Sequence, residues 1–199
     1  AQWTWVNDAS LELGLGPRTI DLPCELPARQ ATPAEYGYEL ARVVRSVAGI
    51  PAAKLIASFE DVAGAAIGKR FHVKYRNHVP GQGIKAISGQ TKSGDFIAAG
   101  PEHPIQRNQR FTNARSLYHA LATSQISQRL VTDAYSVDQK ASRAFAAELL
   151  APRAALLDSL VTSTAAPDAV EKLSQDFLVS TRVIEFQLDG GGYGTFGDD

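Results

Sequence analysis

The chain has 199 residues, of which 44% are hydrophobic and 21% are charged, and its formal net charge is −1 at pH 7. These values are typical of one globular domain, and they argue against binding of nucleic acid or a membrane surface through overall charge. The single cysteine, Cys24, excludes an intramolecular disulfide and a cysteine-rich zinc finger. The N-terminus lacks a signal-peptide pattern, and no apolar run approaches the ~18–20 residues of a membrane span.

Proline residues interrupt residues 1–31, which are expected to form an irregular arm that Trp3 and Trp5 anchor on the domain. The first predicted helix covers residues 32–48, because a capping Thr, a Pro and a Glu stand at the spacing of a capping box. Helical or alternating apolar patterns predict the other elements. These are a helix over 58–66, strands over 71–76, 84–88 and 95–99, and helices over 109–124, 136–150, 168–177 and 180–188.

The most informative stretch is RFTNARSLYH at residues 110–119. It resembles R-F-T-x-A-H-E-x-x-H, a zinc-peptidase helix in which two His hold Zn²⁺ and the Glu is the general base. Residues 141–152, ASRAFAAELLAP, resemble the F-A-A-E-L-L-M-P helix of the ImmA/IrrE family of metallopeptidases. Weaker similarities to the family's strand pair and closing helices follow the same order, so the resemblance covers roughly residues 35–188.

Carried onto this chain, the resemblance places the first His at Arg115, the Glu at Ser116, the second His at His119 and the third ligand, a Glu, at Gln139. Arginine keeps its proton, so position 115 offers a cation where a cation would bind. Serine is too weakly basic to activate water, and a glutamine oxygen is a poor zinc ligand. No confident catalytic or metal-binding residue therefore remains, and the zinc of active family members is not expected.

Other interpretations of these residues remain open. Gln139 follows Ser136 by three residues and fits a capping box, and a lone His119 beside an apolar stripe fits a packed, hydrogen-bonded side chain. Ser116 and His119 lack the orienting acid and oxyanion-hole loop of a nucleophile–base pair. The other three histidines show no ligand spacing. They are His72, His78 and His103.

Arg115 raises a question of charge, because a guanidinium in a vacated metal pocket would be buried without a partner. Asp138 is the first candidate partner, with Asp133 and Glu148 as alternatives. Arg115, His119, Asp138 and Glu148 are therefore possible pocket residues. Arg115 could equally reach solvent along its own stem.

The patterns predict an α+β fold, and the resemblance implies a minimal zincin-like domain with about five or six helices around a small, mainly antiparallel sheet. The expected organisation is an arm over 1–31, the peptidase-like domain over 32–188 and a flexible glycine-rich tail over 189–199.

The resemblance implies a bacterial, cytoplasmic pseudopeptidase that binds a protein, such as a helix-turn-helix repressor or antitoxin, in stress responses, mobile elements or toxin–antitoxin pairs. The alternative is an active zinc metallopeptidase of the family with rearranged ligands, which would recruit Asp138, His103 or His119. Residues 170–184 superficially resemble a helix-turn-helix but carry no basic cluster, so direct nucleic-acid binding is not expected.

Overall fold

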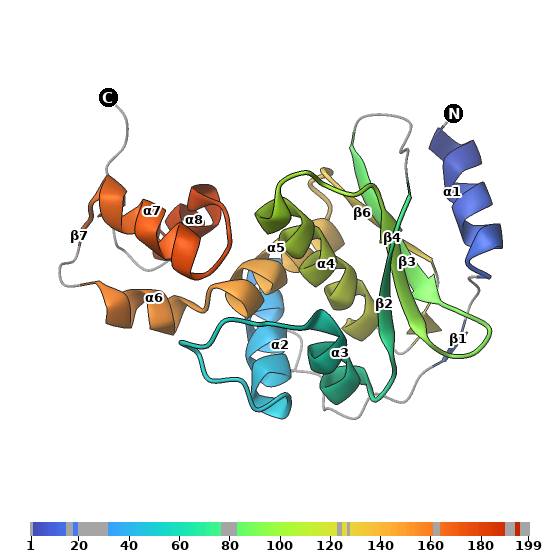
Figure 1. The fold of residues 1–199 in the computed structure, drawn as a ribbon, viewed down its shortest axis with the longest axis horizontal. Helices are drawn as coiled ribbons and strands as arrows, with labels where there is room; N and C mark the ends of the chain where they lie inside the picture. Colours follow the sequence, from blue (N-terminus) through green and yellow to red (C-terminus); the bar gives the residue numbers. More distant parts are fainter. Residues whose placement is uncertain are drawn as a thin grey trace.

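The computed structural model describes residues 2–14, 18–19, 32–76, 83–122, 125–126, 128–160, 164–189 and 194–195. Within these residues the chain has an α+β fold (Figure 1). The helices are α1 (Gln2–Glu12), α2 (Pro33–Val47), α3 (Phe59–Ile67), α4 (Gln106–Leu121), α5 (Val137–Leu150), α6 (Arg153–Ser159), α7 (Pro167–Asp176) and α8 (Thr181–Asp189). The strands are β1 (Arg18–Thr19), β2 (Phe71–Tyr75), β3 (Ile84–Gln90), β4 (Phe96–Gly100), β5 (Gln125–Ile126), β6 (Arg129–Thr132), β7 (Thr164–Ala165) and β8 (Gly194–Thr195).

The main sheet has four strands in the order β2-β4-β3-β6. β3 pairs antiparallel with both β4 and β6, whereas β2 runs parallel to β4, so the sheet is mixed. Two further pairs are short: β1 with β5, antiparallel, and β7 with β8, parallel. β6 therefore forms one edge of the main sheet, beside the N-terminal part of α5.

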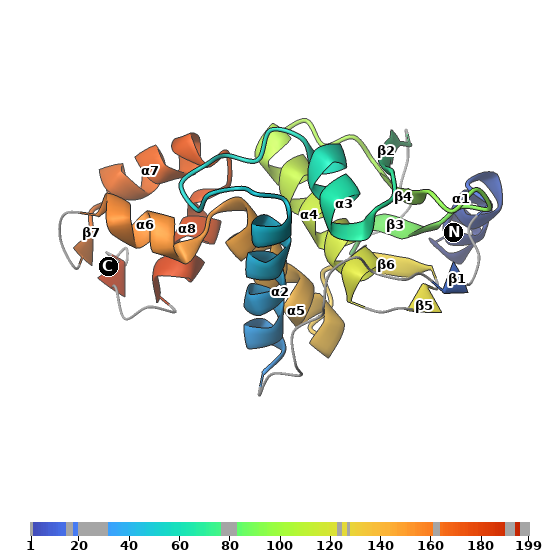
Figure 2. The same ribbon diagram turned by 90° about the horizontal axis from the view of Figure 1, so that it is seen from below.

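Helices cover both faces of the sheet (Figures 1 and 2). Successive strand residues point to opposite faces, and β4 uses both. Its Phe96 and Ala98 belong to the main core under the helices, whereas Ile97 and Ala99 pack with Trp5 of α1 on the other side. This arrangement explains why every residue of β4 is buried.

Several helices begin at the capping residues that the sequence predicts. In α2, the Thr32 hydroxyl accepts a hydrogen bond from the Glu35 N–H at 3.2 Å, and the Thr32 N–H donates to the Glu35 carboxylate at 2.9 Å. In α3, the Ser58 hydroxyl accepts a hydrogen bond from the Asp61 N–H at 3.1 Å, and the helix ends at Gly68, whose φ of 65° is left-handed. Both predicted helices are thus confirmed, within one residue or so at each end.

α2 and α5 cross closely in the middle of the core, and a glycine makes this possible. A Cβ atom at Gly37 would lie 2.3 Å from the Ala141 carbonyl oxygen and 2.9 Å from the Phe145 nitrogen. Both atoms belong to the backbone of α5 and cannot move aside cheaply. Gly37 therefore sets the distance between the two helices.

The structure corrects several boundaries. Residues 2–12 form a helix, so the prediction of an irregular arm over 1–31 is wrong there; Trp5 packs on the sheet as expected, and the Trp3 side chain lies outside the described residues. Eight helices lie within the described residues, not five or six. α4 begins at Gln106, three residues before the predicted start, and its N-cap residue, Ile105, has no capping side chain that would mark this start in the sequence. α8 includes Asp189, and residues 194–195 form β8, whereas the rest of the predicted tail lies outside the described residues.

Candidate functional site

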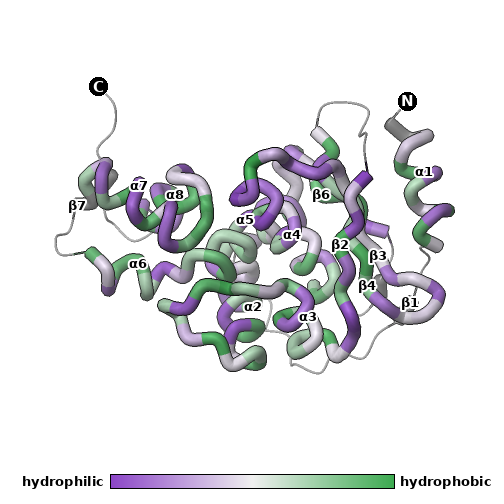
Figure 3. The backbone as a smooth tube through the Cα atoms, viewed as in Figure 1, coloured by the Kyte–Doolittle hydropathy of each residue, from purple (hydrophilic) through white to green (hydrophobic). Residues whose placement is uncertain are grey.

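The helix that carries the stretch 110–119, α4, lies in the centre of the molecule. Every residue from 113 to 121 is buried, including the polar Arg115, Ser116 and His119. α4 carries many hydrophilic residues for a helix in this position (Figure 3). Because a buried polar group is costly without a partner, each of these side chains needs a structural account.

Arg115 is 4% exposed and lies between α4, α5 and β6. Its Nε donates to the Ser142 hydroxyl at 3.2 Å, and its Nη2 donates to the Thr132 carbonyl at 2.6 Å and to the Gln139 side-chain oxygen at 2.5 Å. Burial first, and then the positive charge of Arg143, lower the pKa of Arg115 to about 10. The guanidinium therefore keeps its charge at pH 7, and it joins three elements.

Gln139 connects α5 to the edge of the sheet. Its Nε2 donates to the Leu130 carbonyl at 2.7 Å, and its Oε1 accepts from the Thr132 N–H at 3.0 Å. One donor and one acceptor at this spacing match the peptide group of a neighbouring strand. The side-chain amide thus takes the place of an added strand and, with Arg115 on the Thr132 carbonyl, closes the β6 edge here.

The capping interpretation of Gln139 is correct for its backbone. The Gln139 N–H donates to the Ser136 hydroxyl at 3.4 Å, whereas the side chain turns to β6 and does not complete a capping box. The two side chains expected at ligand positions, Arg115 and Gln139, are thus brought together by the fold.

The prediction that Arg115 pairs with a carboxylate is wrong within the described residues. Each proposed partner pairs elsewhere: Asp138 lies 3.8 Å from Arg129, and Asp133 lies 3.0 Å from Lys85. Glu148 is buried farther along α5, about 14 Å from position 139 at 1.5 Å per residue, where Arg42 approaches it at 3.1 Å. Neutral oxygens satisfy Arg115 instead, because the β6 edge and α5 supply them locally. The alternative that Arg115 reaches solvent is also wrong, since the side chain is buried.

His119 is packed as expected but lacks one hydrogen bond. Its ring meets that of Tyr118 edge-on with centroids 5.2 Å apart, and its Nε2 is buried without a partner among the described residues. Burial, followed by the charges of Arg115 and Arg129, lowers the pKa of His119 to about 4. The imidazole is therefore neutral at pH 7, and its Nε2 remains an unused polar atom.

The remaining candidates do not assemble into a reactive group. The Ser116 hydroxyl donates to the Thr112 carbonyl at 3.0 Å, one turn back on its own helix, so it is not held by His119 as a nucleophile would be. His103 precedes α4 whereas His119 lies in its last turn, about 20 Å away along the helix axis. His72 lies on β2, and His78 lies outside the described residues.

These residues do not fit a zinc site. Oxygen Oε1 of Gln139 already accepts from Arg115 and Thr132, and position 115 holds a cation, so His119 alone offers a free ligand atom. Among the described residues, no group of three His, Cys, Asp or Glu side chains lies close enough to hold a metal ion. No step of a metal-dependent reaction follows from this arrangement.

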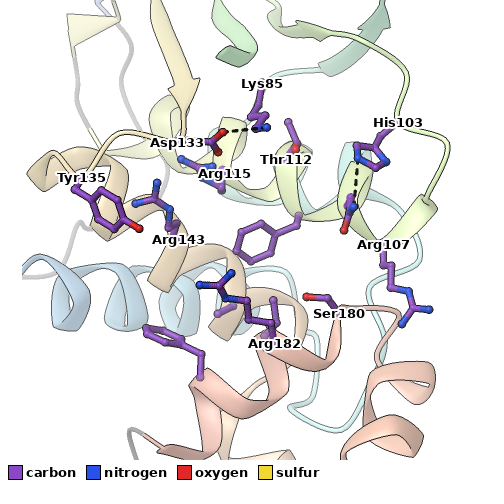
Figure 4. A pocket seen from close by; sticks show the side chains of 15 residues that line it. Lys85, His103, Arg107, Thr112, Arg115, Asp133, Tyr135, Arg143, Ser180 and Arg182 are labelled. Atoms are coloured by element: carbon purple, nitrogen blue, oxygen red, sulfur yellow. Dashed lines mark hydrogen bonds and ion pairs between the residues drawn. The ribbon is translucent and has the colours of Figure 1, made fainter. Parts of the chain in front are cut away.

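A groove of about 650 Å³ opens beside Arg115, between α4, α5, α8 and the end of β3 (Figure 4). Five cationic side chains and one carboxylate line it. The cations are Lys85, Arg107, Arg115, Arg143 and Arg182, and the carboxylate is that of Asp133. Aromatic side chains complete the lining: Phe111, Tyr135 and Phe186.

Of the candidate residues that the sequence suggested, Arg115, Asp133 and His103 line this groove. The other cations are scattered between positions 85 and 182, on four different elements, so no spacing along the chain reveals them. Among them, only Arg143 lies on the second helical segment that the resemblance singles out, residues 141–152.

Comparison with known proteins leaves the family unassigned. No family model matches the chain, and no curated protein matches it in sequence. Within the described residues, no helix has both the length and the apolar character needed to cross a membrane.

Proposed function

We propose that this chain is a pseudopeptidase of the ImmA/IrrE type, with a minimal zincin-like fold, that acts in the bacterial cytoplasm as a protein-binding regulatory module. Its partner is a helix-turn-helix repressor or an antitoxin, in a stress response, a mobile element or a toxin–antitoxin pair. The contact between Arg115 and Gln139 carries the proposal, because two side chains that stand at ligand positions in the resemblance are bonded to each other.

The groove beside this contact supports a binding role. Arg115 and Gln139 hold α4, α5 and β6 together from within, as a metal bound to both helices would. The adjoining groove stays open and is lined by arginines and aromatics, the residue types enriched at protein interfaces. The family's zinc ligands and general base are missing at positions 115, 139 and 116, whereas the groove stays accessible. Both features favour binding of a partner over cleavage.

The proposal is tested with candidate helix-turn-helix repressors and antitoxins, beginning with any encoded beside this chain. Each is mixed with the purified chain, with zinc or with a chelator, and followed by size-exclusion chromatography and gel electrophoresis. We expect co-elution with an intact partner, and far less than one equivalent of zinc by elemental analysis. Chelator-sensitive cleavage that is lost in His119→Ala would instead establish an active metallopeptidase.

A further inference from the structure

The lining of the groove differs in charge from the chain as a whole. The chain has a formal net charge of −1, yet five cations and a single carboxylate line this one groove. The carboxylate, that of Asp133, is already paired with Lys85 at 3.0 Å (Figure 4). Four arginines are left, and none has a carboxylate within 4.0 Å among the described residues.

Neutral groups hold three of these arginines in place. Arg107 donates to the Ser174 hydroxyl at 2.8 Å, and Arg143 donates to the Ala134 carbonyl at 2.9 Å while its guanidinium lies 5.3 Å from the centre of the Tyr135 ring. Such contacts orient a guanidinium and leave its charge uncompensated. Arg182 is exposed and makes no hydrogen bond or ion pair within the described part of the chain.

The innermost cation shows that the groove is a built site. Arg115 is only 4% exposed, and its Nε and Nη2 are used by the protein, whereas its Nη1 has no partner among the described residues. Removing a guanidinium from water is energetically unfavourable, and an anionic ligand in the groove would offset part of this desolvation energy.

The aromatic side chains narrow the choice of ligand. Tyr135 is 82% exposed and Phe186 is 50% exposed, and both border the same groove as Arg143 and Arg182. Exposed large apolar side chains next to arginine are typical of protein interfaces. The ligand should therefore combine negative charge with an apolar group.

We propose that the groove binds a short acidic segment of the partner protein. Carboxylates of the segment pair with Arg143 and Arg182, and an apolar side chain packs on Tyr135 and Phe186. This inference rests on the proposed function and specifies the chemistry of the partner. The segment binds through side chains, because the β6 edge that could accept it as an added strand is closed by Gln139 and Arg115.

Nucleic acid fits less well, because its backbone carries negative charge beyond any single groove. The helix pair α7–α8 that borders the groove has five acidic residues and two basic ones between positions 167 and 189. A polyanion that continues past Arg182 along this helix pair would be repelled by the acidic residues, whereas a short acidic segment contacts only the part of the pair that lines the groove.

The test begins with short random peptides displayed on phage and selected on the full chain, on Arg182→Glu and on Lys172→Glu. Lys172 is a matched control, since it is an exposed cation of the same helix pair outside the groove. We expect enrichment of Asp and Glu with a Leu, Phe or Tyr on the wild type and on Lys172→Glu, and its loss on Arg182→Glu.

The selected peptide is then labelled with fluorescein and titrated by anisotropy beside its Gln/Asn analogue. We expect the affinity of the acidic peptide to fall about tenfold in Arg182→Glu and severalfold in Arg143→Ala, and to fall with added salt. Circular dichroism checks that the variants are folded. No acidic enrichment, or equal binding of the Gln/Asn analogue, would overturn the inference.

Three further outcomes separate this inference from the proposed function and from nucleic-acid binding. If a repressor co-elutes with the chain and Arg182→Glu leaves that complex unchanged, the acidic-segment inference fails and the protein-binding function stands. If single-stranded DNA binds the groove more tightly than any selected peptide and Arg182→Glu abolishes it, the inference fails in favour of nucleic acid. Peptide binding that depends on Arg182, with no repressor captured, would retain the groove chemistry and reject the repressor partner.

Discussion

The guanidinium of Arg115 and the side-chain amide of Gln139 are in direct contact, with Nη2 of the arginine 2.5 Å from Oε1 of the glutamine. The same glutamine oxygen accepts the Thr132 N–H, and the same guanidinium nitrogen donates to the Thr132 carbonyl. Residues from α4, α5 and β6 thus meet at one point. The residues that stand at ligand positions in the resemblance form a hydrogen-bonded connection inside the domain.

Arg115→Ala should lower the free energy of unfolding by about 2–4 kcal/mol, because it leaves several buried acceptors without a donor. Urea denaturation at pH 7 measures the change. Arg182→Ala is the matched control: Arg182 is exposed and bonds to nothing in the described residues, so its change should stay within about 0.5 kcal/mol. An Arg115→Ala protein as stable as Arg182→Ala would refute the structural role of Arg115.

Gln139→Ala should cost roughly 1–3 kcal/mol of unfolding free energy, because the Thr132 N–H and the Leu130 carbonyl lose their partner. Since Gln139 and Arg115 touch, their two effects should not add. A double-mutant cycle with Arg115→Ala should give a coupling energy of about 1–2 kcal/mol. Strictly additive effects would show that the two side chains act independently.

The stability of the fold should depend on pH through His119. Its pKa is lowered from 6.5 to about 4 in the folded state, so the unfolded chain takes up a proton first as the pH falls. The contribution is complete above pH 6.5, is lost progressively toward pH 4, and amounts to roughly 3 kcal/mol at most.

His119→Gln separates this effect from the titration of carboxylates, which both proteins share. At pH 7 the variant should stay folded and lose about 1–2 kcal/mol, because we expect His119 to contribute only its own packing and hydrogen bonds. Between pH 6.5 and 4 its unfolding free energy should fall less steeply than that of the wild type. Parallel pH profiles would mean that His119 is not protonated on unfolding in this range.

Gly37→Ala should destabilise the protein by about 1–3 kcal/mol, because the added methyl group meets the backbone of α5. Gly64→Ala is the opposite case. Gly64 lies in α3, and a Cβ atom added there would have nothing within 4 Å, so alanine should raise stability by about 0.5–1 kcal/mol through its helix propensity. Thermal unfolding of both variants measures the difference, and equal shifts would show that α2 and α5 can separate.

Restoring the metal ligands tests whether the site is a modified metallopeptidase pocket. The triple variant Arg115→His, Ser116→Glu, Gln139→Glu should bind zinc, because side chains 115 and 139 already reach each other and Nε2 of His119 is free among the described residues. Calorimetric titration with zinc gives the stoichiometry. A folded triple variant that binds no zinc would show that the three side chains do not converge on one point.

Much of the local structure follows from the sequence alone. The caps at Thr32, Ser58 and Ser136 use side chains that bond to the backbone within three residues, so they depend little on the rest of the fold. The alternation over residues 71–76 and 84–88 likewise located β2 and β3. The sequence missed α1, α6 and β6, since none of them carries a capping side chain or a long periodic pattern.

Only the tertiary structure decided which partners surround Arg115 in the stretch 110–119. The sequence predicted either a carboxylate partner or solvent for Arg115. The fold instead places neutral oxygens of Thr132, Gln139 and Ser142 around it and pairs Asp133 and Asp138 with other cations. The groove, too, is assembled only in the tertiary structure, because Arg143 and Arg182 come from helices far apart in the chain. Hydrogen bonds within a turn are encoded locally, whereas the partner of a buried charge depends on which distant segments the core brings next to it.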